Sequence, residues 1–298
     1  MTIKAGTAEV SVSNPQKVLF PETGSTKEEL VRYYLAVADL MLPHVSARPL
    51  TLVRFPEGAG GDEFYQKEAQ DYFPDFIQRV QVEISDEMRT YITAENPATL
   101  AYLANLVSIP HIWISLMPDV HVADIVVWDL DPGGSVGFDE IKTGARLLRH
   151  LLSELDIPSH IKLTGSRGIH LSAALQRPMP QPEVFEFSKN VAEMLAKKLP
   201  AAFTTEFSRD KRGNRIYIDY LRNRYAQSFV APYAVRSTPH ASIAMPIEWS
   251  DLDSDIGPQD IRLENVYAFL KERTERLASW HVEAFDFPSS VERLAALS

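Results

Sequence analysis

Asp129 and Asp131 are the residues of this sequence whose spacing points most directly to chemistry. They follow the apolar run Ile125-Val126-Val127 and precede Pro132 and two glycines. Residues two apart in a β-strand point to the same face, so both carboxylates should project together from a strand end. Converging carboxylates repel each other unless a cation lies between them, and hard divalent ions prefer such oxygen-rich sites. The alternative is a strand exit in which the aspartates simply favour the turn.

A second segment has the composition of an anion-binding loop. Residues 164–170 read Thr-Gly-Ser-Arg-Gly-Ile-His and begin thirty-three residues after Asp131, between two strand-like runs. The glycines let backbone amides approach an anion, while Arg167 and His170 add charge-assisted donors. No Gly-Lys-Ser/Thr follows, so this is not a Walker loop. The alternative is an ordinary glycine-containing hairpin turn.

A third acid, Asp219, lies in an alternating strand-like run with Arg215, Arg222 and Arg224 nearby. By itself this pattern is also typical of a surface strand with local ion pairs. Each of the three segments is a weak signal alone, but their order along the chain is much more specific.

The ordered set resembles the three motifs of the archaeo-eukaryotic primase superfamily. More closely, the chain resembles the polymerase domain of bacterial ATP-dependent DNA ligase D, an end-joining enzyme. The similarity begins at Ser13-Asn14-Pro15-Gln16-Lys17 and includes Phe64-Tyr65-Gln66-Lys67 and residues 225–236. It ends near residues 246–249 and so covers nearly the whole chain.

This resemblance implies two-metal nucleotidyl transfer. Asp129, Asp131 and Asp219 would be the catalytic residues and would hold two Mn²⁺ or Mg²⁺ ions, with Mn²⁺ the preference of the family. The family usually has serine where Thr164 stands. Threonine keeps the hydroxyl but adds a methyl group, which weakens the expectation of a ribose contact more than that of a phosphate contact. For His111 taken alone, a satisfied core histidine is the favoured interpretation. The residues that match family contacts to the incoming NTP are His111, Thr164, Ser166, Arg167, His170, Arg222 and Arg236.

The resemblance also implies recognition of DNA ends. Asn14, Lys17 and Lys27 match a pocket for a recessed 5′-phosphate, although on sequence alone the lysines read as solvated surface charges. Phe64 matches a ring that stacks on template bases, and Tyr65 stands where a second phenylalanine is common. Stacking tolerates any base, but a buried core phenylalanine is the alternative for Phe64. The expected partners are gapped or broken double-stranded DNA with a 5′-phosphate, nucleoside triphosphates, a DNA ligase and an end-binding protein.

The expected function is therefore DNA-dependent primer extension at gaps or broken ends, with ribonucleotides preferred, in double-strand-break or gap repair. One alternative is a stand-alone primase-polymerase that makes primers de novo. Two others belong to different classes: a non-catalytic module that binds 5′-phosphorylated ends, and a metal-dependent nuclease. Arginines placed for a triphosphate argue against the nuclease. The tetrapeptide Lys-x-Asp-Gly of a ligase nucleophile does not occur.

Bulk properties are those of an ordinary globular protein, with 298 residues, 45% hydrophobic and 23% charged. No run of eighteen apolar residues and no signal-peptide core occur, so we expect a cytoplasmic bacterial protein associated with the nucleoid and no membrane contact. A net charge of −10 argues against DNA binding by overall charge, yet cations concentrate between Arg209 and Arg236. The absence of cysteine excludes disulfides and zinc–thiolate sites.

The candidate residues need a sheet to position them, and the hydrophobic periodicity predicts one. Strands and helices alternate irregularly, which favours an α+β fold: a mixed or antiparallel catalytic sheet flanked by helices, primase-like, in a single compact unit with an N-terminal lobe. Residues 1–107 would form the lobe that contacts the DNA end and template, and residues 108–298 the catalytic sheet with the metal and nucleotide site. Expected helices are 26–42, 97–106, 138–155, 183–198 and 259–278; expected strands are 50–55, 78–84, 90–93, 110–116, 122–128, 159–164, 169–174, 215–219 and 228–235.

Overall fold

The computed structural model describes residues 1–273 and 283–297. Its contacts separate the chain into two compact units, each assembled from segments that are distant in sequence. Unit 1 comprises Met1–Trp113, Ser228–Met245 and Gln259–Thr274, and unit 2 comprises Ile114–Gln227, Pro246–Pro258 and Glu275–Ser298. Both units combine a sheet with helices, so the expected α+β class is confirmed. The functional roles expected for 1–107 and 108–298 stay predictions.

Unit 1 is built on an antiparallel sheet with the strand order β15-β9-β5-β8-β7, to which β6 adds by pairing with β5. Two short hairpins, β1 with β2 and β3 with β4, accompany it. The strands are β1 Thr2–Ala5, β2 Ala8–Ser11, β3 Val18–Phe20, β4 Ser25–Thr26, β5 Leu50–Arg54, β6 Phe64–Gln66, β7 Gln78–Ile84, β8 Glu87–Thr93, β9 Ser108–Ile112 and β15 Phe229–Val230.

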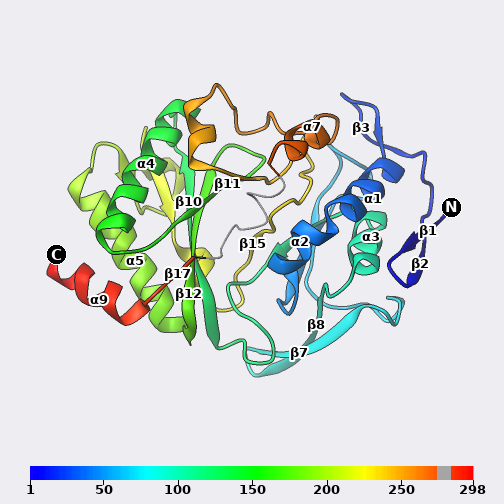
Figure 1. Cartoon of the computed structure of the whole chain (residues 1–298), viewed down its shortest axis with the longest axis horizontal. Helices are drawn as coiled ribbons and strands as arrows, with labels where there is room; N and C mark the ends of the chain where they lie inside the picture. Colours follow the sequence, from blue (N-terminus) through cyan, green and yellow to red (C-terminus); the bar gives the residue numbers. More distant parts are fainter. Residues whose placement is uncertain (274–282, 298) are drawn as a thin grey trace. The chain divides into compact units, whose positions relative to one another are not determined.

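Four helices of the described chain belong to unit 1: α1 Lys27–Ala36, α2 Ala38–Val45, α3 Pro97–Asn105 and α7 Val266–Lys271. Helix α1 begins at the expected capping box, in which Thr26 Oγ1 accepts from the backbone N of Glu29 and the Glu29 side chain accepts from the backbone N of Thr26. Helices α1 and α3 lie side by side (Figure 1). The single helix expected over 26–42 is interrupted at Val37, which ends α1 and precedes α2. The apolar spacing continues across this break, so hydrophobic periodicity did not reveal it.

Unit 2 contains a mixed sheet with the order β13-β14-β10-β12-β11-β16, and β17 pairs with β12. The β12–β17 and β13–β14 pairs are parallel and the other pairs are antiparallel. The mixed sheet expected from the sequence is thereby confirmed. Its strands are β10 Val122–Pro132, β11 His160–Leu163, β12 Ile169–Pro180, β13 Phe203–Thr204, β14 Ile216–Asp219, β16 Pro246–Ile247 and β17 Ala284–Phe285.

The helices of unit 2 cover one face of this sheet. Helices α4 and α5 lie on the same side of β10 and β12 (Figure 1), and the indole Nε1 of Trp128 on β10 donates to Ser188 O on α5 at 2.9 Å. Because side chains alternate along a strand, Asp129 and Asp131 must point to the opposite face. The helical elements are α4 Phe138–Glu154, α5 Gln181–Lys198, α6 Arg209–Arg212, α9 Phe287–Ala296, η1 Leu221–Asn223 and η2 Trp249–Asp253.

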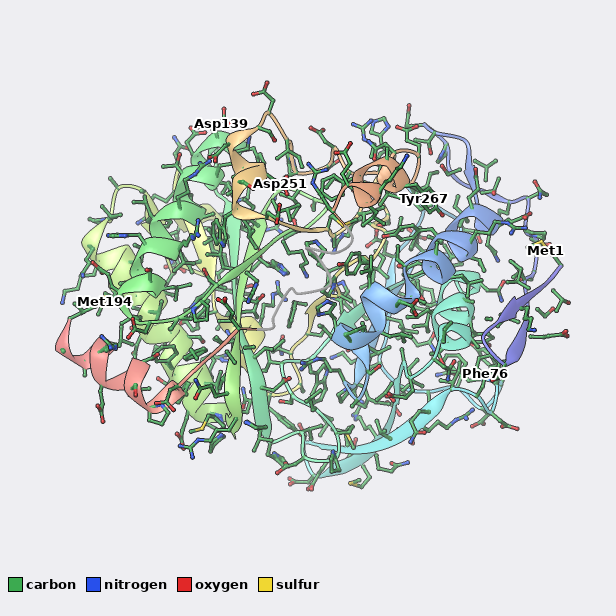
Figure 2. All side chains as sticks on the ribbon, in the orientation of Figure 1. Met1, Phe76, Asp139, Met194, Asp251 and Tyr267 are labelled. Carbon is green, nitrogen blue, oxygen red and sulfur yellow. The ribbon has the colours of Figure 1, made fainter. Side chains whose placement is uncertain are left out.

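Other acidic residues of unit 2 lie on α4 and η2. Figure 2 shows Asp139 of α4 and Asp251 of η2 at the same end of unit 2. Here Lys142 Nζ donates to Ser254 O at 2.9 Å, and Arg146 Nη2 lies 2.8 Å from Asp253 Oδ1. Asp253 and the backbone oxygen of Ser254 therefore help to hold η2 and the residue after it against α4.

Besides the helix over 26–42, two expected elements are much shorter in the structure. The strand expected over 228–235 is reduced to β15, because Pro232 lacks a donor and Tyr233 has a φ of 65° that no strand allows. The helix expected over 259–278 is reduced to α7 among the described residues, and residues 274–278 lie outside them. No helix within 1–273 or 283–297 combines the length and the apolar character that a bilayer span requires.

Candidate active site

Strand register brings the predicted acids together on the face of the unit 2 sheet opposite α4 and α5. Asp129 on β10 lies directly opposite Asp219 on β14 and directly opposite His170 on β12. Opposed residues of neighbouring strands point to the same face, and Asp131 joins them because it lies two residues further along β10. Three segments that are distant in sequence therefore form one acidic face.

Basic groups contact these carboxylates. His170 Nε2 lies 3.2 Å from Asp129 Oδ2, and Arg222 Nε lies 3.0 Å from Asp219 Oδ2. The backbone N of Leu221 donates to Asp219 Oδ1 at 2.9 Å. Asp129 and Asp219 are only 7% and 4% exposed, so these contacts replace the hydration that burial removes.

Like charges nevertheless remain crowded at this face. The charge of Asp129, and then burial, raise the pKa of Asp131 to about 7. Burial, together with the charge of Asp129, also raises the pKa of Asp219, although Arg222 lowers it. Mutual repulsion of this kind is relieved by a bound cation, so the face has the electrostatics that a divalent ion requires.

Asn223 positions Arg222 beside the acids. Its side-chain Oδ1 accepts from Val127 N at 2.9 Å and its Nδ2 donates to Val127 O at 2.6 Å. The amide thus takes the place of a strand residue along β10, immediately beyond the end of β14 at Asp219. Since Asn223 is fully buried, this pairing holds η1, and with it Arg222, against the sheet edge.

The turn that joins β11 to β12 is shaped by Thr164. Its Oγ1 donates to Gly168 O at 3.0 Å and accepts from the backbone N of Ser166 and of Gly168 at 3.3 and 3.2 Å. A Cβ on Gly168 would lie 2.4 Å from Leu130 O, so only glycine lets the turn approach β10 this closely. The turn presents Ser166 and Arg167 beyond the strand ends. Nucleotide contacts by Thr164, Ser166 and Arg167 stay predictions.

Two residues at the acidic face were not expected from the sequence. Lys162 on β11 lies opposite His170 and is 1% exposed, and Tyr217 on β14 lies opposite Asp131. Arg212 places its Cζ 3.7 Å from the centroid of the Tyr217 ring, so at least this cation of the basic segment is structural. In the sequence, Lys162 could be noticed only as a charged residue inside an otherwise apolar strand. Strand register is needed to show that it lies in the same cross-strand row as His170 and Asp129.

Unit 1 contains a cluster of cations, Lys17, Lys27 and Arg54, here called the Lys27 cluster. Lys27 is 7% exposed, and its Nζ donates to Ser13 Oγ at 3.3 Å. Burial, then the charges of Lys17 and Arg54, lower the pKa of Lys27. Asn14 supports the cluster with a φ of 47° in a turn where its carbonyl accepts from Lys17 N at 3.0 Å. Lys27 is therefore no solvated surface charge, and the cluster would be stabilised by an anion.

The two predicted stacking residues are exposed on β6. Phe64 is 47% and Tyr65 68% exposed, so the core alternative for Phe64 is excluded. Arg54 Cζ lies 5.6 Å from the centroid of the Phe64 ring. The edge of the Lys27 cluster therefore continues directly into an aromatic surface, an arrangement typical of single-strand binding.

His111 and Arg236 belong to unit 1. His111 lies on β9 opposite Thr51 and Val230, and the backbone N of Arg236 donates to Ser242 O at 2.7 Å. The nucleotide roles expected for both stay predictions.

Within residues 1–273 and 283–297 no group of three or more histidine, aspartate or glutamate side chains could hold a metal ion as it stands. Mg²⁺ commonly takes one or two protein carboxylates and completes its shell with water and substrate oxygens. The neighbouring carboxylates of Asp129 and Asp131 fit that share of the coordination, as the raised pKa of Asp131 indicates.

The crowding of carboxylates at the acidic face should be measurable as a pH dependence of the free energy of unfolding. The folded-state pKa of Asp131, about 7, exceeds the ordinary value of about 3.9, so its contribution to stability is complete below pH 4 and is lost as the pH rises through 7. In buffer free of divalent ions, urea unfolding should give a free energy lower at pH 8 than at pH 5.5, with roughly 1–3 kcal/mol of the difference due to Asp131. Asp131→Asn should remove that part, and an unchanged pH slope in the variant would contradict the assignment.

The fold and the acidic face together define a protein of the primase-polymerase class. Residues 26–277 match the family model of the LigD primase-polymerase domain, and the chain belongs to this family. The resemblance seen in the sequence is thereby confirmed.

Individual relatives agree. The chain is 30% identical over 278 residues to the multifunctional non-homologous end joining protein LigD of Mycolicibacterium smegmatis, an alignment that covers 92% of this chain and 36% of that protein. It is 30% identical over 259 residues to the bifunctional non-homologous end joining protein LigD of Bacillus subtilis, covering 86% and 42%. The polymerase domain from Mycobacterium tuberculosis ligase D in complex with DNA matches with a TM-score of 0.83 and 28% identity, over 91% of this chain and 98% of that one. The chain thus spans less than half the length of these curated relatives.

Proposed function

We propose that this chain is a nucleotidyltransferase that extends primer strands at gaps or broken ends of DNA, with ribonucleotides preferred, during double-strand-break repair. The main support is the acidic face, where Asp129, Asp219 and His170 meet by strand register and Arg222 is held beside them. Further support comes from relatives named for non-homologous end joining and from a structural relative described in complex with DNA.

The residues of unit 2 divide the chemistry. Asp129 and Asp131 would hold two Mn²⁺ or Mg²⁺ ions, and Asp219 would complete the site nearest the primer 3′-hydroxyl. Such ions, when bound, activate that hydroxyl and neutralise charge on the triphosphate. Arg222, already charged and positioned by Asn223, would stabilise negative charge that develops on the phosphates. Ser166 and Arg167 would bind the triphosphate from the β11–β12 turn.

The residues of unit 1 would recognise the DNA. Lys17, Lys27 and Asn14 would bind the recessed 5′-phosphate, and Phe64 and Tyr65 would stack on template bases. A DNA ligase and an end-binding protein would act with the chain at the bacterial nucleoid, by analogy with its end-joining relatives.

A gapped duplex with a labelled primer tests this function. The downstream strand ends in a 5′-phosphate or a 5′-hydroxyl, and each duplex receives Mn²⁺ or Mg²⁺ with either NTPs or dNTPs. We expect templated addition that is faster with NTPs and with the 5′-phosphate. Binding without addition under every condition would instead identify an end-binding module, and shortening of the primer without added nucleotide would identify a nuclease.

A further inference from the structure

An acidic side chain contacts the Lys27 cluster. Glu57 Oε2 lies 3.0 Å from Lys17 Nζ, and the same Nζ donates to Pro56 O at 2.8 Å. The Glu57 side chain is 75% exposed and that of Lys17 is 32% exposed. A solvent-exposed carboxylate therefore pairs with Lys17.

The loop that contains Glu57 is held in place by its backbone. Gly58 has a φ of +91°, and a Cβ at this position would lie 2.5 Å from Leu19 O. Gly58 N donates to Phe55 O at 2.8 Å, and Ala59 N donates to Leu19 O at 2.7 Å. Leu19 lies on β3 and is fully buried, so the loop is anchored to the core. The position of Glu57 beside Lys17 follows from this anchoring.

We propose that Glu57 is a specificity-determining residue, which competes with DNA for Lys17 and thereby limits the preference for a terminal 5′-phosphate over a phosphodiester. This inference rests on the proposed end-binding role of Lys17 and Lys27 and deepens it. Lys27 is buried and bonded to Ser13, so Glu57 acts on the half-exposed member of the cluster.

The physical basis is a difference in charge. A phosphodiester has one negative charge, whereas a terminal phosphate monoester has a charge of about −1.5 to −2 at pH 7. Displacing the Glu57 carboxylate by a phosphodiester exchanges one single charge for another and gains little. Displacing it by the terminal phosphate gains charge and three acceptor oxygens. Without Glu57, the cost of displacing a carboxylate from Lys17 disappears, and so does its repulsion of the ligand. The terminal phosphate forms the stronger contact and has the larger charge, so it should benefit more.

The test compares two gapped duplexes that differ only in a 5′-phosphate or 5′-hydroxyl at the gap, with binding measured by fluorescence anisotropy at pH 7.5 without metal or nucleotide. The variants are Glu57→Gln, which retains a hydrogen-bond acceptor for Lys17, and Glu57→Ala, which does not. Glu22→Gln is the matched control, an exposed glutamate of unit 1 that removes the same charge. We expect both Glu57 variants to bind the 5′-phosphate duplex more tightly and to gain about threefold in the ratio of affinities, the size expected for one exposed ion pair. Glu22→Gln should keep the wild-type ratio.

The outcomes separate this inference from the proposed function. A wild-type preference for the phosphate that both Glu57 variants leave unchanged or lower would overturn the role of Glu57 and leave end recognition intact. An equal gain in Glu22→Gln would reduce the effect to overall charge and would also overturn it. A wild-type protein without any phosphate preference would overturn end recognition itself, and this inference with it.

Discussion

Asp219→Asn is expected to lower primer extension by at least about 1000-fold, because it removes a charge required in the transition state while keeping the shape of the side chain. Asp219 lies directly opposite Asp129 and is 4% exposed. The asparagine can still accept from Leu221 N, which should preserve the start of η1. Single-turnover extension of a gapped duplex with Mn²⁺ and NTPs is the measurement.

Two controls make this result specific to the acidic face. Asp255→Asn, which removes an exposed carboxylate of unit 2, should extend primers like the wild type. Thermal unfolding of Asp219→Asn should show a folded protein, with a midpoint equal to or above that of the wild type because a crowded charge is gone. If a folded Asp219→Asn still extended primers at more than a tenth of the wild-type rate, the assignment of this face as the catalytic site would be wrong.

Lys27→Gln is expected to abolish most of the preference for a 5′-phosphate, a loss of about ten- to a hundredfold in the ratio of affinities. The reason is the burial of Lys27: its pKa is lowered by desolvation first, so its ammonium has already lost most of its water when an anion arrives. A charge-assisted hydrogen bond formed there is stronger than one formed at the exposed Lys17. Competition between 5′-phosphate and 5′-hydroxyl duplexes in the absence of metal measures the ratio.

Lys4→Gln supplies the comparison, since Lys4 is an exposed lysine of unit 1 on β1. It should lower affinity for both duplexes equally or not at all. Lys27→Gln should not destabilise unit 1, because it removes one of three mutually repelling cations. A Lys27→Gln protein with the wild-type ratio would show that the 5′-phosphate is recognised elsewhere.

Several local features followed from the sequence because each depends on neighbours within a few residues. The capping box at Thr26 and Glu29, and the strand around Asp129, lie where periodicity predicted them. Predictions failed where tertiary contacts overrode local pattern. Tyr233 and its neighbours are as buried as strand residues would be, yet their backbone bonds run to the 242–244 segment instead of a regular ladder.

The candidate site shows the same division. The types of Asp129, His170 and Asp219, and their order along the chain, were sufficient to indicate the family. The direct opposition of these residues, the use of Asn223 to hold Arg222, and the place of Lys162 in the same row required the strand register. Register joins residues that are distant in sequence, and no local pattern encodes it.

The amino-acid sequence by itself determined which chemical groups this protein has, the family to which they belong and the strands and helices that contain them. Only the tertiary structure decided which of those groups meet. It buried Lys27 beside two cations, placed Glu57 against Lys17 and raised the pKa of Asp131 through Asp129. The physical reason is that residue type and periodicity act over one or two turns of chain, whereas burial and the interaction of charges depend on distances in space.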